Sequence, residues 1–273
     1  MKMITKNFCV YVALLFTTTM SAKNPNIIFL LADDLGLRDV GCYGGPIHTP
    51  AIDTLAEKGT RFTTFYSGSA VCSPSRATML TGRQHIRTGI YSWVHDPSQK
   101  SHLLEREITI PEVLKKQGYS TAHFGKWHLG FYKWKHTPTF RGFDSFSGFY
   151  SGGEDYFTHI SSGAYDFRHD DRPNCGAGCS KINSLDQGNY STTVFSREAV
   201  RVIDDHDTSS PLFLYLAYQG VHSPAQVPES YIKPYERTIS NPFRRTFAGM
   251  LSAVDEGKYH LQSQSHIRTS NHF

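Results

Sequence analysis

The chain has 273 residues, of which 39% are hydrophobic, and its formal net charge at pH 7 is +4. A chain of this length can bury one sizeable core. The small net charge, together with the lack of a dense stripe of lysine and arginine, excludes nucleic acid as an expected partner.

The first 22 residues have the layout of a secretory signal peptide (1–22). Basic residues precede the apolar run 8–16, and small residues then lead to a predicted cleavage after Ala22. An uncleaved membrane anchor is the weaker alternative, because the apolar run has about half of the ~20 residues that a span needs. After removal of the signal peptide we expect no membrane span and a location in the secretory pathway, either lysosomal or secreted. Asn189, in an Asn-Tyr-Ser segment, is a potential glycosylation acceptor.

Beyond the signal peptide, short apolar runs alternate with segments of helical character. Residues 27–31 form a continuous apolar run, which is typical of a strand buried on both faces of a parallel sheet. The expected elements that follow are a helix over 49–59, a strand over 61–66, helices over 72–82 and 109–117, a strand over 119–124, an amphipathic helix over 192–205 and a strand over 211–216. Residues 133–188 are expected to form a long irregular loop region. This alternation predicts an α/β fold with a mainly parallel central sheet flanked by helices.

The chain has five cysteines, and four remain once Cys9 leaves with the signal peptide. Cys175 and Cys179 flank a Gly-Ala-Gly segment and are a candidate pair for a small local disulfide. Cys42 and Cys72 are then left unpaired, which is unusual in an exported protein.

Polar residues gather at the expected carboxyl ends of the strands, where open α/β sheets bind ligands. Each cluster alone has a simpler explanation, such as a turn, a solvated loop or, for a lone cysteine, burial as a small apolar side chain. Together they supply carboxylates for a hard cation and cationic groups for an oxyanion, and a helix N-terminus favours an anion at the same place. Adjacent carboxylates favour Ca²⁺ or Mg²⁺ over Zn²⁺, since no Cys/His spacing of a zinc site is present. The clusters are Asp33-Asp34, Cys72 with Arg76, Lys126 with His128, and His222.

Two segments resemble the signatures of the formylglycine-dependent sulfatases. Cys72-Ser73-Pro74-Ser75-Arg76, followed by Leu80-Thr81-Gly82-Arg83, is similar to the first signature, and GKWHLG at residues 125–130 resembles the second. With the acidic pair and the late histidine in the family's order, the resemblance covers a partial sulfatase N-terminal catalytic domain at residues 24–256. It implies the alkaline-phosphatase-like sulfatase fold. The segments most similar to the arylsulfatase B, or N-acetylgalactosamine-4-sulfatase, group are 141–144, 154–156 and 211–235.

The resemblance implies a sulfuric ester hydrolase that acts on sulfated sugars, glycosaminoglycans or aryl sulfates. In this family the formylglycine-generating enzyme oxidises the motif cysteine during export, so that Cys72 would carry a formylglycine. One hydroxyl of the hydrated aldehyde attacks sulfur, and the other then expels sulfate. The resemblance also implies one Ca²⁺ bound by Asp33, Asp34 and the modified Cys72. The remaining implied roles are orientation of the hydrate by Arg76, binding of sulfate by Lys126 and His222, and proton removal by His128.

The family's pattern also includes features that this sequence does not contain. Two further metal ligands and a second sulfate-binding lysine are missing, and residues 257–273 have the composition of a divergent polar tail. We therefore expect a sulfatase fold that is incomplete at the C-terminus. Because Ca²⁺ prefers 6–8 oxygen ligands, a catalytically silent relative that binds sulfated glycans or a full-length partner is the alternative function. A cysteine hydrolase is a weaker third alternative, because Asp33-Asp34 and Arg76 would have no role in it.

Overall fold

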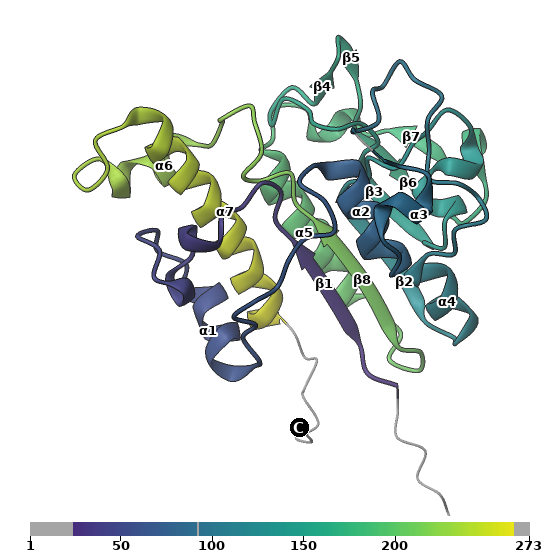
Figure 1. Ribbon diagram of the computed structural model, residues 1–273, viewed down its shortest axis with the longest axis horizontal. Helices are drawn as coiled ribbons and strands as arrows, with labels where there is room; N and C mark the ends of the chain where they lie inside the picture. The colour runs from purple at the N-terminus through teal and green to yellow at the C-terminus, as the bar shows by residue number, and fades with distance from the viewer. Residues whose placement is uncertain (1–23, 92, 265–273) are drawn as a thin grey trace, which may run out of the picture.

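The computed structural model describes residues 24–91 and 93–264, and a six-stranded sheet forms its centre (Figure 1). The strand order is β1-β8-β2-β3-β6-β7. The first four strands in that order are parallel, whereas β6 and β7 are antiparallel to their neighbours, which confirms the predicted α/β fold with a mainly parallel sheet. The strands are β1 (Ile27–Leu31), β2 (Ser120–Lys126), β3 (Ser145–Phe149), β6 (Arg168–Asp170), β7 (Ser180–Ile182), β8 (Leu212–Ala217) and a separate hairpin of β4 (Ile160–Ser161) and β5 (Ala164–Tyr165).

Helices lie on both faces of the sheet, and Figure 1 shows α1, α6 and α7 grouped on one side of the molecule, away from α2, α3 and α4. No helix among the described residues is long and apolar enough to cross a membrane. The predicted signal peptide, like residues 265–273 of the predicted polar tail, lies outside the described residues. The α-helices are α1 (Pro50–Lys58), α2 (Cys72–Thr81), α3 (His85–Thr88), α4 (Ile110–Lys116), α5 (Ser191–Asp204), α6 (Glu229–Ile232) and α7 (Pro242–Gln264).

The sheet is buried on both faces, as its apolar strands predict. Every residue of β8 is buried, and its side chains alternate between two hydrophobic clusters. Leu212, Leu214 and Leu216 pack with residues of α5 and α7. The intervening Phe213 and Tyr215 pack on the other face with residues of α2 and α4. Each such side chain contributes about 1.5–3 kcal/mol relative to an exposed one, so β8 fixes the centre of the sheet.

The parallel strands bring the loops after β1, β2 and β8 to one edge of the sheet. Leu31 and Gly125 both lie opposite Ala217 in the strand register. Gly125 has a φ of 100°, and a Cβ at this position would lie 2.0 Å from the carbonyl oxygen of Ala217. Glycine is therefore required where β2 and β8 approach each other, one residue before Lys126.

The predicted strand over residues 61–66 is wrong. This segment has no regular secondary structure, and Phe62, Phe65 and Tyr66 are 61%, 78% and 83% exposed. Its alternation of aromatic and threonine residues is typical of a strand, but no strand of the described sheets pairs with it. Without a neighbouring strand, the segment forms no sheet face on which its aromatic side chains could be buried.

The predicted irregular region over residues 133–188 is wrong in part. It contains β3, which continues the sheet parallel to β2, and also β6, β7 and the β4–β5 hairpin. These strands have between two and five residues. The strands of two or three residues do not show a clear period in the sequence, because the alternation needs about four or more residues to stand out.

The long helix α7 has no counterpart among the predicted elements. Gly249 and Gly257 lie inside it, and each glycine costs a helix about 1 kcal/mol relative to alanine. A Cβ at Gly257 would lie 2.2 Å from Oγ of Ser196 and 2.5 Å from the hydroxyl oxygen of Tyr218. The glycine that weakens the helical signal thus allows α7 to pack closely against α5. The helix continues to Gln264, past the start of the predicted polar tail.

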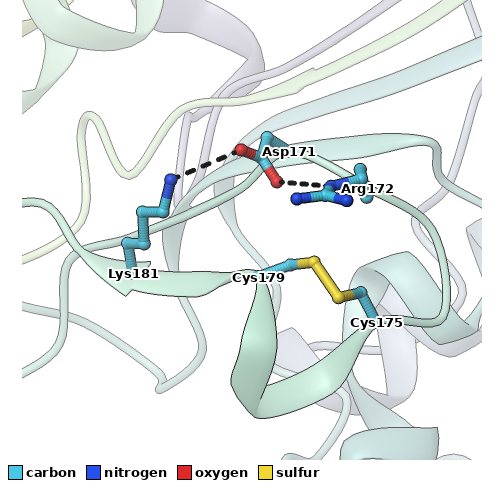
Figure 2. Close-up of a disulfide and its surroundings, with 5 residues drawn as sticks. All are labelled: Asp171, Arg172, Cys175, Cys179 and Lys181. Atoms are coloured by element: carbon cyan, nitrogen blue, oxygen red, sulfur yellow. Dashed lines mark ion pairs between the residues drawn. A yellow bond between two sulfur atoms is a disulfide. The ribbon is translucent and has the colours of Figure 1, made fainter.

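Cys175 and Cys179 form a disulfide, which confirms the candidate pair (Figure 2). Their Cα atoms lie 5.5 Å apart on the two sides of a short 3-10 turn. Figure 2 shows the bond beside Asp171, whose carboxylate forms ion pairs with an arginine and a lysine of the same region. Among the described residues Cys42 and Cys72 are free cysteines, as the sequence predicts.

Candidate active site

The two members of the acidic pair after β1 lie in different environments. Asp33 is buried, and its N–H donates to the carbonyl oxygen of Gly220 at 2.9 Å. Its own carbonyl oxygen accepts from the N–H of Val221 at 2.8 Å, so the end of β1 is tied to the loop after β8. Asp34 has a φ of 58°, and its exposed carboxylate lies 3.7 Å from Nε2 of His222. The turn thus separates one buried carboxylate from one solvated carboxylate.

Cys72 is the first residue of α2, and Arg76 lies one turn later on the same helix. The buried Arg76 side chain donates from Nη1 to the carbonyl oxygen of Lys126 at 2.7 Å, and its Nη2 lies 3.5 Å from Oδ2 of Asp33. These contacts fix α2 against the ends of β1 and β2. As a result, Sγ of Cys72 lies 3.7 Å from Oδ1 of Asp33.

Lys126 ends β2, and its side chain is fully buried. Its Nζ donates to Oδ2 of Asp33 at 2.5 Å and to Sγ of Cys72 at 3.3 Å. A buried ammonium group is costly unless it is paired with an opposite charge. Asp33 supplies that charge, and the pair holds Nζ against position 72.

His222 lies beside Asp33 and Cys72, because one ligand atom of each of these three residues lies within 4.8 Å of the other two. The structure therefore brings most of the sequence-predicted site residues together in what we name the Cys72 cluster. Its members are Asp33, Asp34, Cys72, Arg76, Lys126 and His222.

His128 lies outside these contacts, and no hydrogen bond between described residues joins it to Cys72. Its ring is buried, and its Nε2 lies 2.9 Å from the carbonyl oxygen of His95. A carbonyl oxygen only accepts, so the proton is on Nε2 and Nδ1 keeps a free lone pair. That Nδ1 has no hydrogen-bond partner among the described residues. Burial lowers the pKa of His128 well below its usual value, which keeps the ring neutral.

The sulfatase family profile matches residues 25–257, a range that includes every member of the Cys72 cluster. The chain belongs to the sulfatase family. Among curated sulfatases, arylsulfatase J of Mus musculus is 40% identical over 247 residues, which cover 89% of this chain and 40% of the relative.

Solved structures agree with this membership. The crystal structure of Ps i-CgsB superposes with a TM-score of 0.79 at 33% identity, over 89% of this chain and 55% of that chain. A solved protein in complex with its substrate D-glucosamine-2-N,6-O-disulfate has a TM-score of 0.60 at 28% identity, over 80% of this chain and 38% of that chain. The chain thus spans about half or less of the length of these relatives, and the match confirms the expected sulfatase fold over that part.

The charges of this sulfatase cluster shift the pKa values of its members. Burial by itself would raise the pKa of Asp33, but the charges of Arg76 and Lys126 outweigh burial and lower that pKa to about 2. Burial would also raise the pKa of Cys72, but a hydrogen bond with His222 and the charge of Lys126 lower it. The same hydrogen bond raises the pKa of His222. Position 72 therefore lies in a field that favours negative charge.

The donor atoms of the Cys72 cluster have the chemistry of a Ca²⁺ site but are few. Asp33 and Asp34 offer carboxylate oxygens, the ligand type that Ca²⁺ prefers. Oδ2 of Asp33 is engaged by Lys126, and Oδ1 faces position 72. Because Ca²⁺ takes 6–8 oxygen ligands, these residues supply part of a shell, which water, substrate or groups outside the described residues would complete.

The residues that hold the His222 loop are not among the site residues predicted from the sequence. The buried Tyr156 donates from its hydroxyl to the carbonyl oxygen of His222 at 2.8 Å. The buried Gln219 donates from its side-chain amide to the carbonyl oxygen of Glu154 at 2.7 Å, and its Oε1 accepts from the N–H of Glu154 at 3.2 Å. Residues 154–156 resemble the arylsulfatase B group in sequence, but the resemblance does not show which residues they contact.

Proposed function

We propose that this chain forms the sulfate-binding and nucleophile-bearing part of a sulfuric ester hydrolase of the arylsulfatase type. The observation that carries the proposal is the position of Sγ of Cys72, 3.3 Å from Nζ of Lys126 and 3.7 Å from Oδ1 of Asp33. Buried, convergent charges at the carboxyl ends of parallel strands are typical of active sites. Membership of the sulfatase family supports sulfate as the anion that these cations bind.

Cys72 is, in this proposal, the precursor of a formylglycine that the formylglycine-generating enzyme installs during export. That group supplies a hydrated aldehyde, with one hydroxyl to attack sulfur and a second to expel sulfate. Lys126 and His222 hold sulfate oxygens, and Arg76 keeps α2 in place beside them. His128 accepts a proton at Nδ1, the atom that has a free lone pair.

Asp33 and Asp34 would hold one Ca²⁺ together with an oxygen at position 72. A bound ion there supplies positive charge that offsets the charge developing on the sulfate group. Asp33 has a second task, because its other oxygen holds Nζ of Lys126. One carboxylate can therefore align both the metal and the ammonium group with position 72.

The substrate that we propose is a sulfated carbohydrate, with aryl sulfates as convenient assay substrates. A similar solved protein binds a glucosamine disulfate as its substrate, and the resemblance to the arylsulfatase B group favours N-acetylgalactosamine 4-sulfate. We place the protein in the secretory pathway, lysosomal or secreted, with a glycan on Asn189. Asn189 is exposed two residues before α5, where an acceptor side chain is accessible.

Peptide mass spectrometry of the chain secreted from a eukaryotic host tests the modification of Cys72. We expect the tryptic peptide of residues 62–76 to show the mass change from a CH₂SH to a CHO side chain. The peptide of residues 39–58 contains Cys42 and serves as the internal control, which should keep its thiol. An unmodified thiol at position 72 would remove the proposed mechanism.

A second candidate function is a catalytically silent relative that binds sulfated glycans or a full-length sulfatase partner. The small donor set favours it, because among the described residues the Cys72 cluster contains two carboxylates. In that case Lys126 and His222 would still bind sulfate, but no ester would be cleaved. Hydrolysis of a chromogenic aryl sulfate by the purified chain would exclude this alternative.

Tyr156→Phe should weaken the binding of inorganic sulfate about 3- to 10-fold, because the carbonyl of His222 loses the hydroxyl that fixes its loop. Isothermal titration calorimetry measures the affinity. Tyr165→Phe is the matched control, since the hydroxyl of Tyr165 donates to the carbonyl oxygen of Asn183. We expect both variants to lose about 1 kcal/mol of stability and the control to keep its sulfate affinity. Equal affinities in the two variants would show that Tyr156 does not position His222.

A further inference from the structure

A second set of side chains that could bind a metal ion is separate from the Cys72 cluster. His102, Glu105 and His136 each offer one ligand atom, and these atoms lie within 4.8 Å of one another. The sequence does not reveal the set, because His136 follows Glu105 by 31 residues. The fold joins them by placing the loop before α4 beside a short 3-10 helix, η3 (Trp134–His136). These residues therefore form a possible metal site even though the sequence lacks the local Cys/His spacing of a zinc motif.

Both imidazole rings present Nε2 to the same carboxylate oxygen. Nε2 of His136 lies 3.0 Å, and Nε2 of His102 lies 3.9 Å, from Oε1 of Glu105. In a tetrahedral zinc site the ligand atoms are about 3.3 Å apart, since each lies about 2.0–2.1 Å from the ion. The two measured separations bracket that value. The rings are stacked, with centroids 3.6 Å apart and planes 9° apart, so the lone pairs are nearly parallel and the His102 ring must rotate out of the stack before both can point to one ion.

The hydrogen bonds of the two rings decide which nitrogen is free. Nδ1 of His102 lies 2.9 Å from the carbonyl oxygen of Lys100, which places the proton on Nδ1 and leaves Nε2 as a lone pair. Nδ1 of His136 accepts from the N–H of Lys133 at 3.3 Å, so Nε2 carries the proton. When a metal binds, that proton moves to Nδ1, and the long bond to Lys133 is given up. No net proton is released in this exchange.

We propose that His102, Glu105 and His136 form a Zn²⁺ site. Two imidazoles and one carboxylate are a ligand set that Zn²⁺ accepts, with water in the fourth position. The buried side chain of His136 is held in place by its surroundings. Glu105 is half exposed, so an ion can reach it from solvent. The half-exposed Lys135 has its Nζ 2.6 Å from Oε1 of Glu105 and would move into solvent when the ion takes its place.

The bound ion would stabilise the turn that follows Lys126. Gly130, in that turn, packs directly on His102, because a Cβ at Gly130 would lie 2.6 Å from the Cα of His102. The indole N–H of Trp127 donates to the carbonyl oxygens of both Gly130 and His136 at 3.0 Å. The two histidines therefore contact the same turn from different segments. The proposed site does not depend on the proposed sulfatase activity.

Titration of the metal-free Cys72→Ala chain with ZnCl₂ by isothermal calorimetry tests the site. That background lacks the sulfur donor of the Cys72 cluster. We expect one Zn²⁺ per chain and a dissociation constant at least about 10-fold weaker when His102→Ala is added. The matched control is His206→Ala, since the ring of His206 contacts the carbonyl oxygen of Ser210. Co²⁺ should give the absorption of a tetrahedral site in the background chain and in the control, and lose it in the His102 variant.

An affinity that is equal in the background chain and the His102→Ala variant would overturn the proposal. Loss of the ion on Asp33→Asn with retention on His102→Ala would also overturn it, because the ion would then occupy the Cys72 cluster. Far-UV circular dichroism of each metal-free variant checks that it is folded. If His102→Ala does not fold, Glu105→Gln at the half-exposed carboxylate provides the same comparison.

Discussion

Replacement of Asp33 by asparagine should lower the free energy of unfolding by about 3–5 kcal/mol. The Asp33 carboxylate is the counter-charge of two buried cations, with Oδ2 lying 2.5 Å from Nζ of Lys126 and 3.5 Å from Nη2 of Arg76. Asparagine keeps the shape of the side chain but removes its charge, so both cations stay buried without a partner of opposite charge. Urea unfolding in the presence of EDTA measures the loss without a contribution from bound metal.

Asp34→Asn is the matched control, because it makes the same chemical change one residue later. The carboxylate of Asp34 is 59% exposed and lies 3.7 Å from Nε2 of His222, a distance typical of a weak ion pair. We expect its unfolding free energy to stay within about 0.5 kcal/mol of the parent value. Equal losses in the two variants would contradict the role of Asp33 as a buried counter-charge.

The same carboxylate should make the parent chain sensitive to acid. The pKa of Asp33 is about 2 in the folded chain, below its ordinary value of 3.8. Its contribution is therefore complete above about pH 4 and is lost as the pH falls toward 2, because protonation removes the charge that the cations need. In urea titrations at stepped pH, the Asp33→Asn variant should lack this part of the acid slope. A slope identical to that of the parent would count against the lowered pKa.

The place of the Cys72 cluster could be predicted only in part from sequence, because Asp33 and His222 follow apolar strands, whereas the strand expected before Cys72 does not form. β1 and β8 are recognisable as buried strands of a parallel sheet, and the carboxyl ends of such strands share one edge. Asp33 and His222, which follow these two strands, were therefore expected to lie near each other, and they do. The difference between Asp33 and Asp34 could not be predicted, because it depends on a left-handed turn at Asp34 and on hydrogen bonds to residues after β8.

Features that depend on contacts between residues distant in the sequence could not be predicted. The five-residue β3 is stabilised by its pairing with β2, and α7 contains glycines that only its packing partners explain. His102, Glu105 and His136 come together from two loops, so no local spacing of residues in the sequence indicates the set. The exposed 61–66 segment is the opposite case. Its aromatic and threonine residues alternate as in a strand, but the segment forms no strand because no neighbouring strand pairs with it.

Cys72→Ala should reduce the hydrolysis of a chromogenic aryl sulfate by about 10³-fold or more, because the proposed reacting group is built on this side chain. Sγ lies 3.3 Å from Nζ of Lys126, so the substitution leaves no side chain that could become the proposed formylglycine at the place where the cations converge. It leaves the ion pairs of Asp33 with Lys126 and Arg76 intact, and the loss would be chemical rather than structural. Steady-state rates at saturating substrate, compared at equal amounts of folded protein, measure it.

Cys42→Ala is the matched control for that measurement. Cys42 is a free cysteine like Cys72, but its surroundings are Asp53 and Arg61 rather than the buried cations of the Cys72 cluster. Its rate should equal that of the parent chain. A rate that survives Cys72→Ala would refute the assignment of position 72, and an equal loss in both variants would point to a structural effect of losing a thiol. A parent chain that binds sulfated glycans without cleaving aryl sulfates would favour the silent relative, since sulfate binding by the cations, as proposed, does not require the reacting group.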